Sequence, residues 1–298
     1  MSPSVPFYLV DVFTDVPLAG NPLPVVAEAE RLEAPMMRAV AREFNQSETT
    51  FALPPTRHGA LRRLRSFTPT GDEVVGAGHN ALGAWWWLAT AGELELDDEG
   101  GALVAQEIGD RVLPVEVVGN GGTPTAIALE QAPPEFGRVV EDAAELAAAL
   151  GLALGDLDDH VPAQVVSTGA AHLLVPARDR AAVGRAQPDA PRLKAMLAEA
   201  GGQGCYLYCL DPVDATATAH ARFFNPTVGI WEDPATGSAA GPLVCRLASL
   251  GVVGEGVPVL VEQGHAMGRP SQIRVEVAGA RVRIAGTGVV VAEGTLKL

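Results

Sequence analysis

The sequence contains few cysteines and no pattern that uses them. Three cysteines, Cys205, Cys209 and Cys245, occur among 298 residues. Because an odd and sparse set builds no disulfide framework, we expect a reducing, cytoplasmic location. Cys205 and Cys209 lie in the apolar run GCYLYCL, with no histidine at zinc-finger spacing. Buried structural thiols are therefore expected there, and no metal site.

Basic residues and long apolar runs are also scarce. The chain has 21 Lys and Arg against 36 Asp and Glu, a net charge of −15. This charge argues against nucleic acid or an anionic membrane surface as a partner, although a local pocket can still bind a small anion. No apolar run reaches the ~18 residues of a membrane span, and the N-terminus lacks the features of a signal peptide.

The length and composition indicate a globular chain of two domains. Hydrophobic residues make up 48% and charged residues 19% of the 298 positions. Such a chain can bury large cores, and domains commonly contain about 150 residues.

Two parts of the sequence resemble each other at a nearly constant spacing. FNQSETTFAL (44–53) aligns with GGQGCYLYCL (201–210), and RSFTPTG (65–71) with RFFNPTVG (222–229), both at an offset of 157. GHNALGAWWWLATAG (78–92) aligns with GSAAGPLVCRLASLG (237–251) at 159. The ordered set predicts an internal duplication. The alternative is that strand–turn–helix units in Ala- and Gly-rich chains look alike.

Both copies predict the same order of elements: a helix, two strands, and a second helix followed by glycine. The predicted helical segments are 38–44, 79–92, 192–201 and 238–251. We therefore expect an α/β (α+β) fold of two pseudo-symmetric domains, each a barrel-like sheet wrapped around a central helix. The first would span 1–119, joined by the strand 287–298, and the second 120–286. GNGGTP (119–124) is the linker candidate.

The segment EDPATGSAAG (232–241) combines two acids with a run of small residues. Pro234 suits the first turn of a helix, so Thr236 to Ala239 would present backbone N–H groups at a helix N-terminus. Such an end binds carboxylate or phosphate. GAGHNALGA in the first copy offers the same construction. The alternative is small residues for tight helix packing, or simple N-caps.

The two copies differ in their ionisable residues. Glu48 aligns with Cys205, and Asp233 aligns with Val74 or Gly76, depending on the offset. Each copy thus has an acid that the other lacks, as expected where proton-donor and proton-acceptor roles are separated. Burial would make Glu48 a better base near neutrality.

A histidine and a hydroxyl also occupy equivalent positions, since His79 aligns with Ser238. Structural alternatives remain open for three of these residues. Glu48 could be an outward-facing strand residue, Asp233 a helix cap, and His79 a cap or core histidine.

Together these motifs resemble the PhzF-type family of phenazine-biosynthesis isomerases. The matching segments are VDVFTDVPLAGNPLPVV (10–26), NQSETTF (45–51), FTPTGDEVVGAGHNALGA (67–84), STG (167–169), RFFNPTVGIWEDPATGSA (222–239) and EQGHAMGRPSQI (262–273). The resemblance implies the diaminopimelate-epimerase fold, a homodimer and no cofactor. It also implies isomerisation of a cyclic acid by moving a proton along the ring.

The family's site residues carry over to positions of this chain. Glu48 of SETTF would be the proton shuttle. His79 of the AGH motif, and Asp233 and Ser238 of EDPATGS, would position and polarise the substrate. The further residues expected to bind substrate are Asn21, Gly78, Asn80, Thr236 and Gly237.

Three features distinguish this chain within the wider fold. Its glycine-rich turns carry no cysteine, which excludes the two-thiol mechanism of related racemases. Asn80 follows His79 where the family commonly has proline, adding a donor and an acceptor. Trp85–Trp87 cannot all face one core from a helix, so one of them, or Trp231, could reach a cleft, a domain seam or a dimer interface; plain packing is the alternative.

The sequence therefore predicts a cofactor-independent isomerase acting on a small, cyclic or enolisable carboxylic acid in a cleft between two halves. Two other functions remain open. One is an epimerase that uses Glu48 and Asp233 as opposed bases. The other is a non-catalytic binding or scaffold protein with the same fold.

Overall fold

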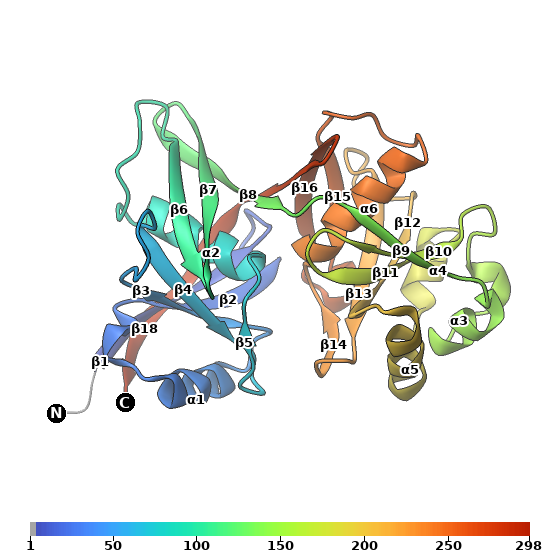
Figure 1. Ribbon diagram of the computed structural model, residues 1–298, viewed down its shortest axis with the longest axis horizontal. Coiled ribbons are helices and arrows are strands. Elements are labelled where there is room, and N and C mark those ends of the chain that lie inside the picture. Colours follow the sequence, from blue (N-terminus) through green and yellow to red (C-terminus); the bar gives the residue numbers. More distant parts are fainter. Residues whose placement is uncertain (1–3) are drawn as a thin grey trace. The chain divides into compact units, whose positions relative to one another are not determined.

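The computed structural model describes residues 4–298, which form two compact units (Figure 1). Unit 1 comprises Met1–Glu130 with Ala285–Leu298, and unit 2 comprises Gln131–Ile284. The chain therefore passes between the units twice. The sequence placed these passages after residues 119 and 286. Residues 1–3, which begin the segment expected to contain no signal peptide, lie outside the described residues.

Unit 1 is built on one mixed sheet. Its strands pair in the order β18-β1-β2-β3-β4-β6-β7-β8, with β5 also against β4; β2–β3 and β4–β6 are parallel. The elements are β1 (Ser4–Val12), β2 (Asn21–Val26), η1 (Ala29–Arg31), α1 (Ala34–Phe44), β3 (Thr49–Leu53), β4 (Arg62–Phe67), β5 (Glu73–Val74), α2 (His79–Thr90), β6 (Ala102–Ile108), β7 (Arg111–Asn120), β8 (Thr123–Gln131) and β18 (Gly288–Lys297).

Unit 2 repeats this pattern. Its strands pair in the order β9-β10-β11-β12-β13-β15-β16, with β14 against β13; β11–β12 and β13–β15 are parallel. The elements are β9 (Glu135–Val140), α3 (Ala143–Ala149), η2 (Leu154–Asp156), β10 (Ala163–Ser167), β11 (Ala171–Pro176), α4 (Arg180–Arg185), α5 (Ala190–Ala200), β12 (Gly204–Cys209), β13 (Ala219–Asn225), β14 (Ile230–Asp233), α6 (Gly237–Ser249), β15 (Val259–Gln263), η3 (His265–Met267), β16 (Ser271–Ala278) and β17 (Arg281–Gly286).

The matching orders, including both parallel pairings at equivalent places, confirm the predicted α/β fold and its internal repeat. The four predicted helices are present as α1, α2, α5 and α6. The predicted linker GNGGTP, however, is the turn of the β7–β8 hairpin inside unit 1, with Gly121 and Gly122 at positive φ. Its composition is as typical of a tight turn as of a linker.

Each unit surrounds a central helix, α2 in unit 1 and α6 in unit 2. Ten of the 12 residues of α2 and nine of the 13 residues of α6 are buried. The close packing of α2 requires glycine at position 83, because a Cβ there would lie 2.6 Å from Val12 and 2.7 Å from Leu23. Figure 1 shows α2 among the strands of unit 1.

A second layer of helices covers the other face of each sheet. In unit 1, Met37 and Val40 of α1 pack on Phe51 of β3. In unit 2, Leu193 and Leu197 of α5 join an equivalent cluster. This double cover explains why β3 and β12 are buried at every residue, with no alternation of buried and exposed positions.

The three adjacent tryptophans pack within unit 1. Trp85 is fully buried and donates to Gln106 Oε1 at 2.8 Å. Trp87 is 6% exposed and stacks on Tyr8, with ring centroids 4.7 Å apart. Trp86 is half-buried beside Gly288.

Strand register corrects one part of the sequence alignment. Thr49 pairs with Phe67 in unit 1, and Cys205 pairs with Phe224 in unit 2. Cys205 is therefore equivalent to Thr49 and not, as the 157-residue offset suggested, to Glu48. The two inter-strand loops differ in length by one residue, which a search for identical letters did not detect. Glu48 still has no acidic counterpart.

A bidentate ion pair occurs at the same place in both units. In unit 1, Arg65 donates through Nε and Nη2 to both carboxylate oxygens of Glu73, at 2.7 and 2.6 Å. Its guanidinium lies 5.1 Å from the ring centre of Phe67. The pair joins β4 to β5, immediately before the segment that enters α2. This bond lowers the pKa of Glu73.

In unit 2, Arg222 makes the same two bonds to Glu232, both at 2.8 Å, and lies 4.8 Å from the Phe224 ring centre. This pair is more deeply buried, with both side chains 9% exposed against 19% and 31% in unit 1. Arg222 Nη1 also donates to the carbonyls of Val183 and Ala186. The first acid of EDPATGS is thus an ion-pair partner.

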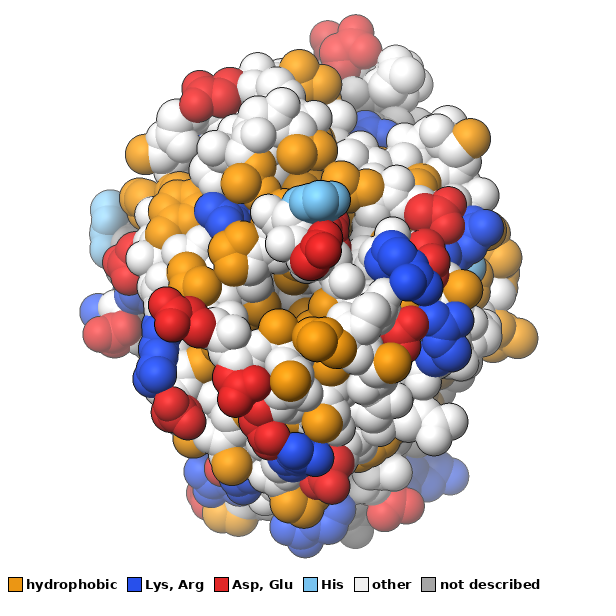
Figure 2. Space-filling view, turned by 90° about the vertical axis from the view of Figure 1, so that its right-hand side faces the viewer, with side chains coloured by type: hydrophobic (Ala, Val, Ile, Leu, Met, Phe, Trp, Pro, Cys, Tyr) orange, Lys and Arg blue, Asp and Glu red, His pale blue; other side chains and the backbone are white. Residues whose placement is uncertain are grey.

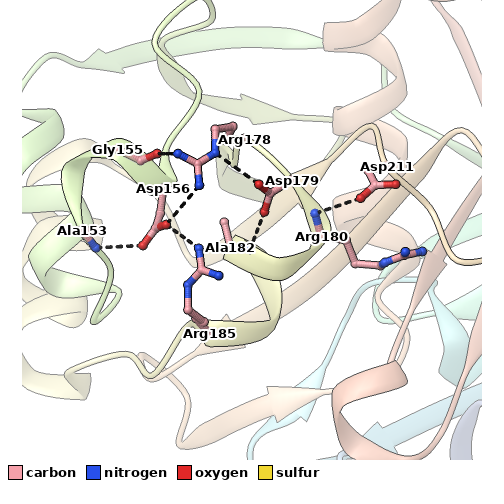
Figure 3. Close-up of polar contacts among 9 residues, drawn as sticks. All are labelled: Ala153, Gly155, Asp156, Arg178, Asp179, Arg180, Ala182, Arg185 and Asp211. Atoms are coloured by element: carbon pink, nitrogen blue, oxygen red, sulfur yellow. Dashed lines mark hydrogen bonds and ion pairs between the residues drawn. The ribbon is translucent and has the colours of Figure 1, made fainter.

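An ion-pair network holds the short helix α4 in place (Figure 3). Asp179 caps α4 by accepting from the Ala182 N–H at 2.8 Å. Arg185, at the other end, donates to Asp156 at 2.5 Å.

Charges of both signs are interspersed over the face drawn in Figure 2, with no large area of one sign. None of the helices in residues 4–298 combines the length and the apolar character that a membrane span requires.

The two equivalent ion pairs predict unequal costs of removal. Arg222→Met leaves the Glu232 carboxylate buried without its partner and should reduce the free energy of unfolding by roughly 3–5 kcal/mol. Arg65→Met leaves a more exposed carboxylate and should cost roughly 1 kcal/mol or less. Urea denaturation followed by circular dichroism tests both. Equal effects would contradict the assignment of Arg222 as the deeper anchor.

Candidate active site

The unit 1 site contains three of the predicted residues and one that was not singled out. Asn21 begins β2, His79 begins α2, and Glu48 directly precedes β3. Ser47 joins them: its hydroxyl donates to Asn21 Oδ1 at 3.2 Å and lies 3.4 Å from His79 Nε2. Because the Ser47 proton is directed at Asn21, His79 Nε2 acts as donor to Ser47 in this arrangement.

Glu48 follows Ser47 in the same loop. The residue is half-buried, and its Oε2 is shielded from solvent. Glu48 is therefore not an outward-facing strand residue. It precedes β3, and its side chain is only partly exposed to solvent. A carboxylate placed in this way can exchange a proton with a ligand while most bulk water is excluded.

His79 is neutral at physiological pH. The residue is 8% exposed, and burial lowers its pKa from 6.5 to about 4. An uncharged imidazole can donate or accept one hydrogen bond but does not attract an anion as a cation would. Any attraction for a carboxylate at this point must therefore come from the N-terminus of α2.

Asn80 and Gly78 bond to each other. Asn80 is 2% exposed; its Oδ1 accepts from the Gly78 N–H at 2.7 Å. Its Nδ2 donates to the Gly76 carbonyl at 3.0 Å and to Ser66 Oγ at 3.1 Å. Asn80 thus holds the turn before α2 through side-chain hydrogen bonds. A proline at this position could not make them, because its side chain has no polar atoms. The predicted roles of Asn80 and Gly78 in substrate binding stay predictions.

The unit 2 site centres on Asp233, the last residue of β14, which is 7% exposed. Asp233 Oδ2 accepts from the Thr236 hydroxyl at 2.5 Å. Gln263 holds both residues: its Nε2 donates to the Asp233 carbonyl at 2.6 Å, and its Oε1 accepts from the Thr236 N–H at 3.1 Å. The side chain of Thr236 and its N–H therefore stabilise this turn.

The structure corrects the expected start of the second central helix. Helix α6 begins at Gly237, with Thr236 as its N-cap, so Pro234 lies outside its first turn. The Pro234 carbonyl instead accepts from Ser271 Oγ at 2.9 Å. Asp233 is likewise too far upstream to be the cap. Two other strands, β15 and β16, thus provide the side chains that define the turn, Gln263 and Ser271, and the local sequence gives no sign of them.

Ser238 contacts a histidine that the sequence analysis missed. Its hydroxyl lies 3.2 Å from Nε2 of His172, near the start of β11. His172 is 3% exposed, and burial lowers its pKa to about 4. Within residues 4–298 its Nδ1 has no hydrogen-bond partner. Gly237 is fixed nearby by its carbonyl, which accepts from Gln131 Nε2 at 3.0 Å.

Each site contains a contact between a histidine and a serine, but the two residue types exchange positions between the units. In unit 1 a histidine begins the central helix and a serine comes from a strand-adjacent loop. In unit 2 the serine is on the central helix and the histidine is on a strand. Ser47 was detectable within the SETTF segment. His172 was not, because no motif surrounds it and its partner is 66 residues away.

Comparison with known proteins agrees with the resemblance stated from the motifs. A family model described as PhzC-PhzF, phenazine biosynthesis-like protein, matches residues 10–294. The trans-2,3-dihydro-3-hydroxyanthranilate isomerase of Pseudomonas fluorescens is 33% identical over 300 residues, covering 98% of this chain and 99% of that protein.

Solved structures show the same fold. The Bacillus anthracis phenazine biosynthesis protein of the PhzF family superimposes with a TM-score of 0.91 at 28% identity, covering 99% of this chain and 100% of that one. A hydroxyproline epimerase from Agrobacterium vitis, solved with bound trans-4-hydroxy-L-proline, has a TM-score of 0.67 at 13% identity, covering 99% and 93%. The latter likeness concerns the fold alone.

The buried histidine of the unit 1 site predicts a measurable titration. His79 should titrate near pH 4 rather than 6.5, measured from its imidazole carbon shifts by NMR and assigned with His79→Gln. Because the unfolded chain takes up the proton first, stability should fall as pH decreases from 6.5 to 4. The loss due to His79 alone should reach about 2 kcal/mol at pH 5. A pKa near 6.5 would contradict the described burial.

Proposed function

The chain belongs to the phenazine biosynthesis-like PhzC-PhzF family of isomerases, and we propose that it moves a proton within a small, cyclic carboxylic acid without a cofactor. In this proposal Glu48 removes a proton from a carbon activated by conjugation or by an adjacent carbonyl. Glu48 then returns the proton at another carbon of the same molecule. The unit 1 and unit 2 sites take complementary parts in this one reaction.

The observation that carries the proposal is the environment of Glu48. Its loop is tied to the start of α2 through the Ser47–His79 contact and to β2 through the Ser47–Asn21 bond. Because the His79 imidazole is uncharged, Glu48 is the charged base of this loop that can remove a proton from a substrate carbon.

The start of each central helix supports an acidic substrate. The first N–H groups of an α-helix have no partner within the helix, and the aligned peptide dipoles make this end attractive to anions. Gly78 is the N-cap of α2, and α6 begins with Gly237 and Ser238, so small residues at both ends let a ligand approach the backbone. We propose that these ends bind the substrate carboxylate, whereas Asp233, His79 and Ser238 orient and polarise the rest.

We propose further that the substrate is a small anion and that the chain acts as a homodimer in the cytoplasm. The Pseudomonas relative is named for trans-2,3-dihydro-3-hydroxyanthranilate, so this compound is the first to test. A thermal-shift screen of cyclic carboxylic acids would follow. Any ligand found would be incubated in D₂O and examined by NMR for exchange of carbon-bound hydrogen.

Glu48→Gln should reduce turnover of a substrate found in this way by at least roughly 100-fold, because the amide cannot accept the proton. Ligand affinity should change little, since the side-chain volume is conserved. Glu43→Gln is the matched control: Glu43 is an exposed glutamate near the end of α1, and its replacement should leave turnover unchanged. Turnover and affinity are measured separately, by NMR and by calorimetry.

Three outcomes would contradict the proposed reaction. Equal loss of binding and turnover in Glu48→Gln would make Glu48 a binding residue. Deuterium incorporation with inversion at a stereocentre, lost in both Glu48→Gln and Asp233→Asn, would indicate an epimerase with two opposed bases. A ligand that binds but exchanges no hydrogen would support a non-catalytic binding protein.

A further inference from the structure

A buried glutamate anchors a loop at the same place in each unit. In unit 1, Glu107 on β6 is 1% exposed and accepts from the N–H groups of Thr56 and Arg57, at 2.6 and 2.9 Å. The Thr56 hydroxyl adds a bond of 2.6 Å. Arg63, paired with Glu107 in the strand register, brings a guanidinium nitrogen to 3.4 Å. The carboxylate thus has a permanent positive charge beside it.

The corresponding glutamate of unit 2 is Glu262 on β15, also 1% exposed. It accepts from the N–H groups of Val213 and Asp214, at 2.5 and 3.0 Å, and so anchors the equivalent loop. The residue paired with it in the strand register is His220, whose Nδ1 lies 2.7 Å from Glu262 Oε1. A histidine therefore replaces the arginine of unit 1.

The environment of the two glutamates therefore differs in one contact. Glu107 lies beside the guanidinium of Arg63, whereas Glu262 lies beside the imidazole of His220. An imidazole nitrogen can bind a metal ion, which a guanidinium does not do.

A second histidine completes the cluster. His265, on η3, has its ring centre 5.2 Å from that of His220. Its Nδ1 is buried and has no hydrogen-bond partner among residues 4–298. One ligand atom each of His220, Glu262 and His265 lie within 4.8 Å of one another. A buried imidazole nitrogen without a hydrogen-bond partner is unfavourable, and in this residue it occurs next to a carboxylate and a second imidazole.

We propose that His220, Glu262 and His265 form a binding site for a divalent transition-metal ion, with zinc as the best fit. Two imidazoles and one carboxylate are a ligand set that zinc accepts in tetrahedral geometry. Ligand atoms on a tetrahedral zinc ion lie about 3.4 Å apart, so side-chain rotations that draw the three groups closer would complete the site. The ion places positive charge where unit 1 has Arg63.

The role assigned to the ion is structural. It joins η3 and β15 to the loop that Glu262 anchors. Gln263, the next residue of β15, holds the turn of Asp233 and Thr236 through its side chain. Neighbouring side chains alternate across a strand, so the metal site and the unit 2 site lie on opposite faces of β15. This proposal does not depend on the proposed function.

The test uses the full chain, stripped of metal with a chelator, and titrates it with Zn²⁺ by calorimetry. His265→Gln removes one ligand from a residue without a side-chain anchor, so the fold should persist. The matched control is His160→Gln. His160 is exposed and belongs to the other group of possible ligands among the described residues, with Asp158 and Asp159.

One zinc ion should bind per chain and raise the thermal midpoint by a few degrees at saturation. His265→Gln should weaken binding more than the roughly 10- to 100-fold that loss of an outer-shell partner costs, whereas His160→Gln should leave it unchanged. Co²⁺ substituted for zinc should give the intense visible bands of a tetrahedral ion in the wild type and in His160→Gln, but not in His265→Gln.

Three results would overturn the proposal. The first is no saturable binding by the wild-type chain, and the second is unchanged affinity in His265→Gln. The third is loss of binding in His160→Gln, which would move the site to the exposed group. Glu262→Gln would not distinguish loss of a metal ligand from loss of the loop anchor, because Glu262 has both roles in this proposal.

Discussion

The bidentate arginine–glutamate pair before each central helix is the interaction on which both candidate sites depend. It fixes the short strand β5 or β14 against its neighbour, and the chain turns from there into α2 or α6. Without this bond, nothing in the sequence of small residues would hold the turn in one conformation. A run such as ATGSAAG has almost no side chains of its own, so its shape is imposed from both ends. Buried polar groups then complete the constraint, Asn80 in unit 1 and Gln263 in unit 2.

The internal repeat explains how one scaffold supports different chemistry in its two copies. The strand order, the ion pair and the loop-anchoring glutamate are the same in both units. The substitutions occur next to these shared parts. His79 stands where unit 2 has Ser238, and Arg63 where it has His220. Because the shared bonds carry the fold, the neighbouring positions are free to acquire a base, a neutral imidazole or a metal ligand.

Much of the fold could be predicted from periodicity and from repeated letters, because the signals are local. Strand alternation, the two apolar helices and the glycines that follow them all come from adjacent residues. The predictions of the sequence were wrong where a contact between residues far apart in the chain determines the structure. The one-residue register difference at Cys205 is set by pairing with Phe224, and the start of α6 by side chains from β15 and β16. The same is true of the candidate site. Glu48 and His79 lie in local sequence motifs, whereas His172 contacts Ser238 only because the fold brings β11 close to the start of α6.

The pairing of β18 with β1 has a consequence for how the protein is made on the ribosome. Unit 2 is a single continuous stretch, so all of its residues are synthesised before strand β18 of unit 1. Unit 1 needs its final strand along nearly the whole of β1, from Lys297 beside Ser4 to Gly288 beside Val12. The edge of β1 therefore stays unpaired on that side until β18 has been synthesised and has left the ribosome. The earlier half of the gene thus encodes the unit that is completed last.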